Sequence, residues 1–275
     1  MTSFDTGTDG VPSNGAAPLP PAVLELDDVT MRFGGVVALR EVGIQVRAGE
    51  IFALIGPNGA GKTTVFNVIT GVVRPTEGVV RFDGRRIDGM KRFRITKAGI
   101  ARTFQNIRLF PNMTAVENVL VGADAHHRTG AVGAALGLSW HRREERTGRE
   151  QAGELLDFVG ISARAGEAAK NLSYGDQRRL EIARALATEP RLLLLDEPAA
   201  GMNPAEKQSL QALIRKIRDS GRTVLLIEHD MGLVMDISDR LAVLDFGEKI
   251  AEGLPREVQR NAKVIEAYLG APRAS

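Results

Sequence analysis

The chain has 275 residues, of which 43% are hydrophobic, and its formal net charge is +2. This length allows a sizeable core with a subdomain, the near-balanced charge gives no argument for nucleic acid binding, and the absence of cysteine excludes disulfides and thiolate chemistry. No run reaches the roughly 18 consecutive apolar residues of a membrane span, so the sequence predicts no transmembrane helix.

The first part of the sequence predicts a lead-in followed by strands. Residues 1–21 are rich in Gly, Pro, Ser, Thr and Asp and lack the pattern of a secretory signal, which predicts a disordered lead-in. Partly alternating apolar residues predict antiparallel strands over 23–33 and 36–50. The continuous apolar run 51–55 predicts a strand buried on both faces, and 79–84 predicts an edge strand with a turn.

Helical patterns dominate residues 112–185 and predict a helical subdomain inserted into an α/β body. Within it, residues 126–148 mix Gly, His and Arg without clear periodicity, which predicts a flexible or surface-bound excursion. Strand and helix then alternate again, with segments at 192–196 (strand), 204–221 (helix), 223–228 (strand), 231–238 (helix), 241–253 (hairpin) and 264–270 (helix).

The segment GPNGAGKT at 56–63 matches the phosphate-binding pattern G-x-x-x-x-G-K-[ST]. It stands between the buried strand 51–55 and a helix predicted over 61–70, which is the context that the motif requires. In this pattern backbone N–H groups surround a β-phosphate, Lys62 bridges phosphates and the Thr63 hydroxyl can bind Mg²⁺. The predicted phosphate-binding residues are Gly56, Pro57, Asn58, Gly59, Ala60, Gly61, Lys62 and Thr63.

Polar residues follow three other strand-like runs. Asp196, in LLLLDEP, can hold the hydration shell of Mg²⁺, and Glu197 beside it can orient the water that attacks a γ-phosphate. His229, in LIEHD, can sense the γ-phosphate, and the amide of Gln105, in GIARTFQNIRLF, can contact metal and water together. Taken alone, His229 and Gln105 are more typical of solvated strand ends.

The stretch NLSYGDQRRLEIARALA at 171–187 predicts a second helix start with the properties of an anion site. Ser173 is the expected N-cap, ahead of small and apolar residues at helical spacing. A helix N-terminus carries free N–H groups and roughly half a unit of positive charge. The phosphate loop already supplies the chain with one phosphate-binding site. The second anion site, at this helix start, therefore has no evident use within a single chain.

The order GPNGAGKT, Gln105, LSYGD, LLLLDEP and His229 resembles that of the ATP-binding cassette (ABC) ATPases over residues 23–270. LSYGD is similar to the family signature LSGGQ, which P-loop kinases and GTPases lack. The finer text, including RTFQNIRLF, EPAAGMNP and VIEAYLG, resembles the ATP-binding subunit of branched-chain amino acid importers, with relatives that serve urea and amide uptake.

The resemblance implies an α/β fold, a P-loop NTPase core of the ABC type with a mostly parallel central sheet, an antiparallel β subdomain and an inserted α-helical subdomain. It implies one nucleotide-binding domain over 22–270 and a C-terminal helix and tail over 255–275. Within that domain, the RecA-like core would cover about 22–104 and 189–254, and the helical subdomain about 105–188.

Carried over by position, the resemblance implies that ATP and Mg²⁺ are the ligands. The phosphate and metal residues would be Lys62, Thr63, Thr64, Gln105 and Asp196. Phe33 falls where the family places an aromatic residue that stacks on adenine, although the usual residue is Tyr, and Val37 falls where an apolar contact with the base is common. A phenylalanine at a strand end is also typical of a core residue.

The resemblance also implies the catalytic roles and a dimer. Glu197 would be the general base, His229 would contact the γ-phosphate, and Gln105 would relay to the membrane subunit. Ser173 and Gly175 would close over the γ-phosphate held by a second ABC subunit, identical or related. The other partners would be permease subunits, contacted mainly through 105–125, and indirectly a periplasmic or lipid-anchored solute-binding protein.

Besides Phe33, three residues depart from the family pattern. Tyr174 replaces a signature glycine, Asp176 replaces a glutamine, and Asn203 stands where many relatives have Asp. We expect Asp176 to satisfy N–H groups at the helix start rather than to face ATP, and the change at Asn203 leaves open the contact expected there across the dimer.

The resemblance locates the chain peripherally at the cytoplasmic face of the membrane, as an ATPase that drives an importer of hydrophobic amino acids or a related small solute. An alternative is the ATPase of a lipid or lipopolysaccharide exporter, although RTFQNIRLF and SYGDQRR favour the importer. A cassette protein that acts on DNA or the ribosome is a third alternative, and the chain lacks the second cassette, long coiled coils or cysteines usual there. The sequence does not name the solute.

Overall fold

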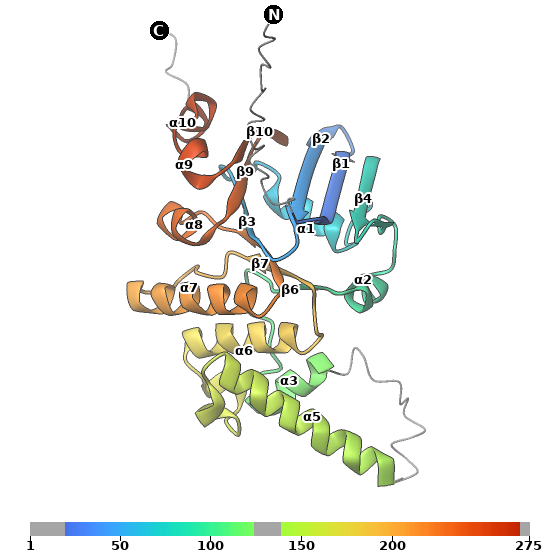
Figure 1. Ribbon diagram of the computed structural model, residues 1–275, viewed down its shortest axis with the longest axis vertical. Coiled ribbons are helices and arrows are strands. Elements are labelled where there is room, and N and C mark those ends of the chain that lie inside the picture. Colours follow the sequence, from blue (N-terminus) through green and yellow to red (C-terminus); the bar gives the residue numbers. More distant parts are fainter. Residues whose placement is uncertain (1–19, 124–138, 270–275) are drawn as a thin grey trace, which may run out of the picture.

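The computed structural model describes residues 20–123 and 139–269 (Figure 1). Residues 1–19 of the predicted lead-in and 126–138 of the predicted excursion lie outside the described residues. Two sheets and a group of helices make up the described part. None of its helices combines the length and the apolar character that crossing a membrane requires.

The larger sheet is mostly parallel, as predicted. Its strand order is β10-β9-β3-β8-β7-β6, and only the β9–β10 hairpin is antiparallel. The strands are β3 (Ile51–Ile55), β6 (Ile100–Arg102), β7 (Leu192–Asp196), β8 (Thr223–Ile227), β9 (Arg240–Asp245) and β10 (Glu248–Gly253). The carboxyl ends of the five parallel strands therefore meet at one edge of this sheet.

The smaller sheet is antiparallel, with the order β2-β1-β4-β5. Its strands are β1 (Ala22–Phe33), β2 (Val36–Arg47), β4 (Glu77–Phe82) and β5 (Arg85–Arg86). The long hairpin β1–β2 confirms the predicted antiparallel pair. The prediction of an edge strand at 79–84 was wrong, because the two-residue β5 pairs with the outer side of β4.

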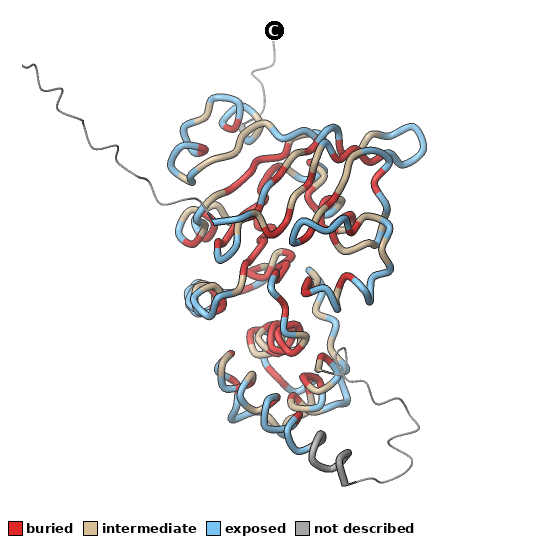
Figure 2. Tube along the Cα trace, turned by 45° about the vertical axis from the view of Figure 1, so that its right-hand side comes forward, coloured by how far each residue is buried: buried red, intermediate tan, exposed pale blue. Residues whose placement is uncertain are grey.

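The strands β3, β7 and β8 are buried along their whole length (Figure 2). Successive residues of each strand join different clusters: Ile51, Leu193 and Leu195 pack in one core, and Phe52, Leu192 and Leu194 in another. Because a strand points alternate side chains to opposite faces, a strand that is covered on both faces reads as a continuous apolar run.

Helices cover both faces of the larger sheet and form a separate group at one end of the molecule (Figure 1). The first set is α1 (Lys62–Ile69), α2 (Arg92–Ala98), α7 (Pro204–Asp219), α8 (Met231–Ile237), α9 (Pro255–Val258) and α10 (Ala262–Leu269). The second set is α3 (Ala115–Ala123), α5 (Ser139–Phe158) and α6 (Tyr174–Leu186), which lie between β6 and β7 along the chain. The domain limits given above stay a prediction.

The prediction of an irregular excursion was wrong for residues 139–148, which form the first half of α5. This segment has no apolar stripe and therefore gives no helical periodicity. Its Arg and Glu residues are good helix formers, and Arg146 pairs with Glu150 one turn on, at 3.0 Å.

Candidate functional site

Residues 56–63 join the carboxyl end of β3 to α1, as the phosphate-binding pattern predicts. The backbone passes very close to the β9–β10 hairpin, since a Cβ atom on Gly56 would lie 2.1 Å from the Leu244 carbonyl oxygen. The amide of Gly247, in the same hairpin, donates to the Ala60 carbonyl oxygen at 3.1 Å. The loop is thus held in its curved form by the sheet as well as by α1.

We expect Gly56→Ala to lower the free energy of unfolding by about 3 kcal/mol, because the added methyl group meets a backbone carbonyl that has no room to yield. The matched control is Gly59→Ala, where the glycine also has a positive φ (82°) but no atom lies within 4 Å of the added Cβ. Its expected cost is about 1 kcal/mol. Chemical denaturation measures both, and equal losses would contradict the steric account.

The loop borders an open cavity of about 420 Å³. Its lining residues are Val36, Val37, Ala38, Asn58, Gly59, Ala60, Gly61, Lys62, Thr63, Thr64, Glu197 and Phe246. The structure therefore brings Val37 to the phosphate loop. Phe33 is 48% exposed and is not in this lining, so its contact with adenine stays a prediction. Phe246, at the β9–β10 turn, is a lining residue that no sequence motif indicated.

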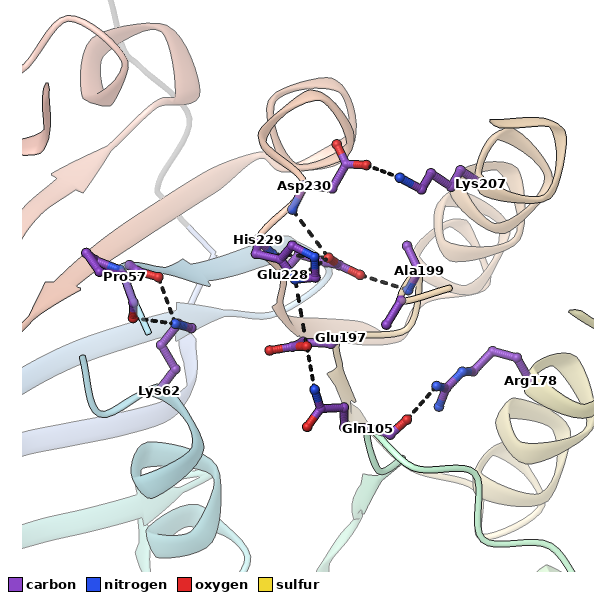
Figure 3. A network of polar contacts seen from close by, with 12 residues as sticks. Pro57, Lys62, Gln105, Arg178, Glu197, Ala199, Lys207, Glu228, His229 and Asp230 are labelled. Atoms are coloured by element: carbon purple, nitrogen blue, oxygen red, sulfur yellow. Dashed lines mark hydrogen bonds and ion pairs between the residues drawn. The ribbon is translucent and has the colours of Figure 1, made fainter. Parts of the chain in front are cut away.

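Lys62 is the buried cation of the loop. Its Nζ donates to the carbonyl oxygens of Gly56 (2.7 Å) and Pro57 (2.9 Å), so the side chain folds back over the loop (Figure 3). Burial lowers the pKa of the ammonium, and the carboxylates of Glu197 and Asp196 oppose that shift. An anion in the cavity would meet this charge next to the free N–H groups of α1.

Asp196 ends β7 and is almost completely buried. Arg102, at the end of the neighbouring strand β6, donates to its Oδ2 at 2.6 Å and to Asn67 Oδ1 at 2.8 Å. Both side chains of the pair are only 8% exposed, so water solvates neither charge well and each charge is compensated by the other. Sequence reasoning missed Arg102, because an arginine next to a strand end carries no recognisable motif.

Glu197, Gln105 and His229 come together at the carboxyl ends of their strands (Figure 3). Gln105 Nε2 donates to Glu197 Oε2 at 2.7 Å, and His229 Nδ1 lies 3.7 Å from the same oxygen. Glu197 has a positive φ of 46°, and its backbone amide donates to the Ile227 carbonyl oxygen, so the chain turns sharply after β7. Two residues widely separated in the sequence, Gln105 and His229, thus lie against the carboxylate of Glu197.

A second acid, Glu228, anchors the loop that follows Glu197. It is fully buried, and its side chain accepts hydrogen bonds from the amides of Ala199 (2.8 Å) and His229 (3.1 Å) (Figure 3). Burial raises the pKa of this carboxyl. Sequence reasoning assigned a role to His229 and missed Glu228, the residue before it. The signal that could have found Glu228 is an acid at the end of an apolar strand.

The second helix start has the predicted form. Ser173 is the N-cap of α6, and its Oγ accepts from the Asp176 amide at 3.2 Å. Ser173 and Gly175 line a different cavity, of about 370 Å³, and are not in the lining of the phosphate-loop cavity. Asn203 caps α7 through a reciprocal pair of hydrogen bonds with Glu206, at 3.0 and 2.9 Å.

A phosphate loop between a parallel strand and a helix, with acids at the end of another parallel strand of the same sheet, defines a P-loop nucleotide-binding protein. The family model described as ABC transporter matches residues 39–200, and one described as branched-chain amino acid ATP-binding cassette transporter matches residues 248–274. The chain therefore belongs to the ABC transporter family, and it binds ATP as these cassettes do.

Similar curated proteins include ATP-binding proteins of branched-chain amino acid transporters. Over 249 residues, 90% of this chain and 98% of the relative, the chain is 49% identical to the high-affinity branched-chain amino acid transport ATP-binding protein BraF of Pseudomonas aeruginosa. Over the same share of both chains it is 45% identical to the corresponding protein LivG of Escherichia coli strain K12.

Solved ABC cassettes share the fold. A nucleotide-free ATP-binding cassette from an ABC transporter superposes with a TM-score of 0.80 at 33% identity, covering 91% of this chain and 100% of that one. A dimeric cassette in a post-hydrolysis state, bound to ADP and Pi, superposes with a TM-score of 0.72 at 29% identity, covering 85% of this chain and 99% of that one. The predicted fold class and family are confirmed.

Proposed function

We propose that the chain hydrolyses ATP to drive a membrane importer of branched-chain amino acids. Two comparisons support this solute class: the match of residues 248–274 to the branched-chain family model and the 49% identity to BraF over 249 residues. Both comparisons favour branched-chain amino acids over the lipid-exporter and the urea or amide alternatives. The observation that carries the ATPase is the convergence of Gln105 and His229 on Glu197 beside the phosphate loop.

In this proposal the triphosphate lies against the loop 56–63, with Lys62 turned from the carbonyls of its own loop to the β- and γ-phosphates. Thr63 and Thr64 add hydroxyl groups at the start of α1, and Val37 contacts the base. Phe33 is the proposed adenine-stacking residue.

The residues present also fit Mg²⁺, which favours oxygen ligands. Thr63 is exposed at the cavity, the carboxylate of Asp196 lies at the end of β7 in the same sheet, and Gln105 supplies an amide oxygen. Bound Mg²⁺ would neutralise charge that develops on the phosphates.

Glu197 is the proposed general base. Its carboxylate lines the cavity and can accept a proton from the attacking water, while Gln105 and His229 hold the water and the γ-phosphate in place. Ser173 and Gly175 of a second cassette then complete the binding site around the γ-phosphate. Within one chain these two residues line another cavity, so they are free to contact the nucleotide of a partner. The similar dimeric cassette bound to ADP and Pi supports this arrangement.

We further propose that the chain binds permease subunits at the cytoplasmic face of the membrane, and through them acts with a solute-binding protein. The segment 105–125 supports this role because it exposes large apolar side chains: Phe110 (44%), Met113 (39%) and Val121 (37%). Exposed apolar groups gathered on one segment are typical of protein interfaces.

Leucine uptake into proteoliposomes that contain the assembled transporter tests the proposal. Lys62→Ala is expected to lower both ATP hydrolysis and ATP-dependent uptake at least 100-fold, because the phosphates lose their buried cation. The control Lys263→Ala removes an exposed charge from α10 and is expected to leave both rates unchanged. Hydrolysis without uptake of any branched-chain amino acid would contradict the assigned solute class.

A further inference from the structure

Tyr174, which stands in place of a signature glycine, connects two loops. It is the first residue of α6, directly after Ser173. Its hydroxyl donates to the Ala200 carbonyl oxygen at 3.0 Å, in the loop that follows Glu197. Its ring lies against Gly201, where a Cβ atom would be 3.6 Å from Tyr174 Cε1. Neither contact is available to a glycine.

One turn along α6, Arg178 holds the segment that contains Gln105. The guanidinium is fully buried and donates to the carbonyl oxygens of Phe104 and Gln105, each at 2.7 Å (Figure 3). Glu181 accepts from Arg178 at 2.8 Å and also from the amides of Phe104 (3.4 Å) and Arg108 (3.3 Å). This buried pair ties the backbone of residues 104–108 to α6 from both sides.

The two connections meet, since Arg178 Nη2 lies 3.3 Å from the Tyr174 hydroxyl. The result is a continuous path from Gln105 through Arg178 and Tyr174 to Ala200. Gln105 closes the path on its other side, because its amide donates to Glu197, three residues before Ala200. The tyrosine hydroxyl donates to Ala200 and accepts from Arg178, so a shift of the Ala200 loop or of the Arg178 guanidinium disturbs one of its two bonds.

We propose that Tyr174 is a positioning residue that couples the Gln105–Glu197 pair of its own subunit to Ser173, the group offered to the nucleotide of the second subunit. The inference rests on the proposed function and extends it: the two ATP sites of a dimer would sense each other through this path. When Gln105 leaves Glu197 to contact nucleotide and metal, the backbone held by Arg178 moves with it. Tyr174 transmits that movement to the N-terminus of α6.

Tyr174→Phe removes the hydroxyl and keeps the ring, so it tests the coupling with little change in packing. We expect a three- to tenfold lower kcat for ATP, a KM within twofold of the original, a reduced Hill coefficient and an unchanged Tm. The matched control is Ser162→Ala, which removes one hydroxyl that bonds to Asp157 at 3.1 Å on the exposed surface. It should leave all four quantities unchanged.

A double variant separates coupling from a purely structural role. If the path is real, Tyr174→Phe lowers kcat much less in a Gln105→Ala background than in the unaltered chain, because the path is already broken. Equal effects in both backgrounds, or a lower Tm with unchanged kcat and Hill coefficient, would overturn the coupling and leave the ATPase assignment intact. Absence of hydrolysis by the unaltered chain would instead overturn the proposed function, and the coupling with it.

Discussion

Replacing Glu197 with glutamine is expected to lower ATP hydrolysis by about 10²- to 10⁴-fold while nucleotide binding is preserved. The amide has nearly the shape of the carboxylate. It can still accept the hydrogen bond from Gln105 Nε2, which is 2.7 Å long in the unaltered chain. It cannot accept a proton from water. Because the γ-phosphate is retained, the dimer is expected to stay closed in ATP, since the nucleotide favours the state in which both subunits contact it.

Steady-state phosphate release and binding of a fluorescent ATP analogue measure these two effects separately. Glu266→Gln, on the exposed side of α10, is the matched control and should behave as the unaltered chain. Hydrolysis by the Glu197 variant at the original rate would show that another group is the base.

Ser173→Arg is expected to abolish ATP hydrolysis while nucleotide binding to the isolated chain is unchanged. In the described part of the chain, Ser173 lies outside the lining of the phosphate-loop cavity, so the long cation cannot reach nucleotide bound in the same subunit. In a dimer it would stand where the partner's γ-phosphate must fit. Loss of the N-cap should cost only about 1 kcal/mol of folding stability.

The control for this variant is Ser162→Arg, which places the same side chain at an exposed position outside α6. It should hydrolyse ATP normally. Weaker nucleotide binding by monomeric Ser173→Arg, measured at a temperature where the variant is fully folded, would contradict the assignment of Ser173 to a second subunit's site.

Much of this site was predictable because its motifs follow from local geometry. GPNGAGKT has meaning only between a buried strand and a helix, and the short apolar runs within 51–55, 192–196 and 223–228 indicated buried strands. The residues that follow these runs were assigned roles at one ATP site, and the ends of parallel strands meet at one edge of a sheet. The contact of Glu197 with Gln105 agrees with these assignments.

The rest depended on partners that a sequence pattern does not contain. The role of Arg102 depends on its ion pair with the carboxylate of Asp196, 94 residues away. Phe246 reaches the cavity only because the β9–β10 hairpin lies beside the phosphate loop. Residues 139–148 lack an apolar stripe, so helix propensity was their only signal. Tyr174 was noticed as a departure from the signature, but its bond to Ala200 needed the folded chain.

Sedimentation velocity of two variants, with and without saturating Mg-ATP, tests the central claim that Ser173 of one chain completes the ATP site of another. We expect the Glu197→Gln variant to form a dimer, with twice the mass of the monomer, when ATP is added. The double variant Glu197→Gln, Ser173→Arg should bind ATP equally well and stay monomeric. Equal dimerisation of the two variants, or a monomeric Glu197→Gln variant in saturating ATP, would contradict that claim.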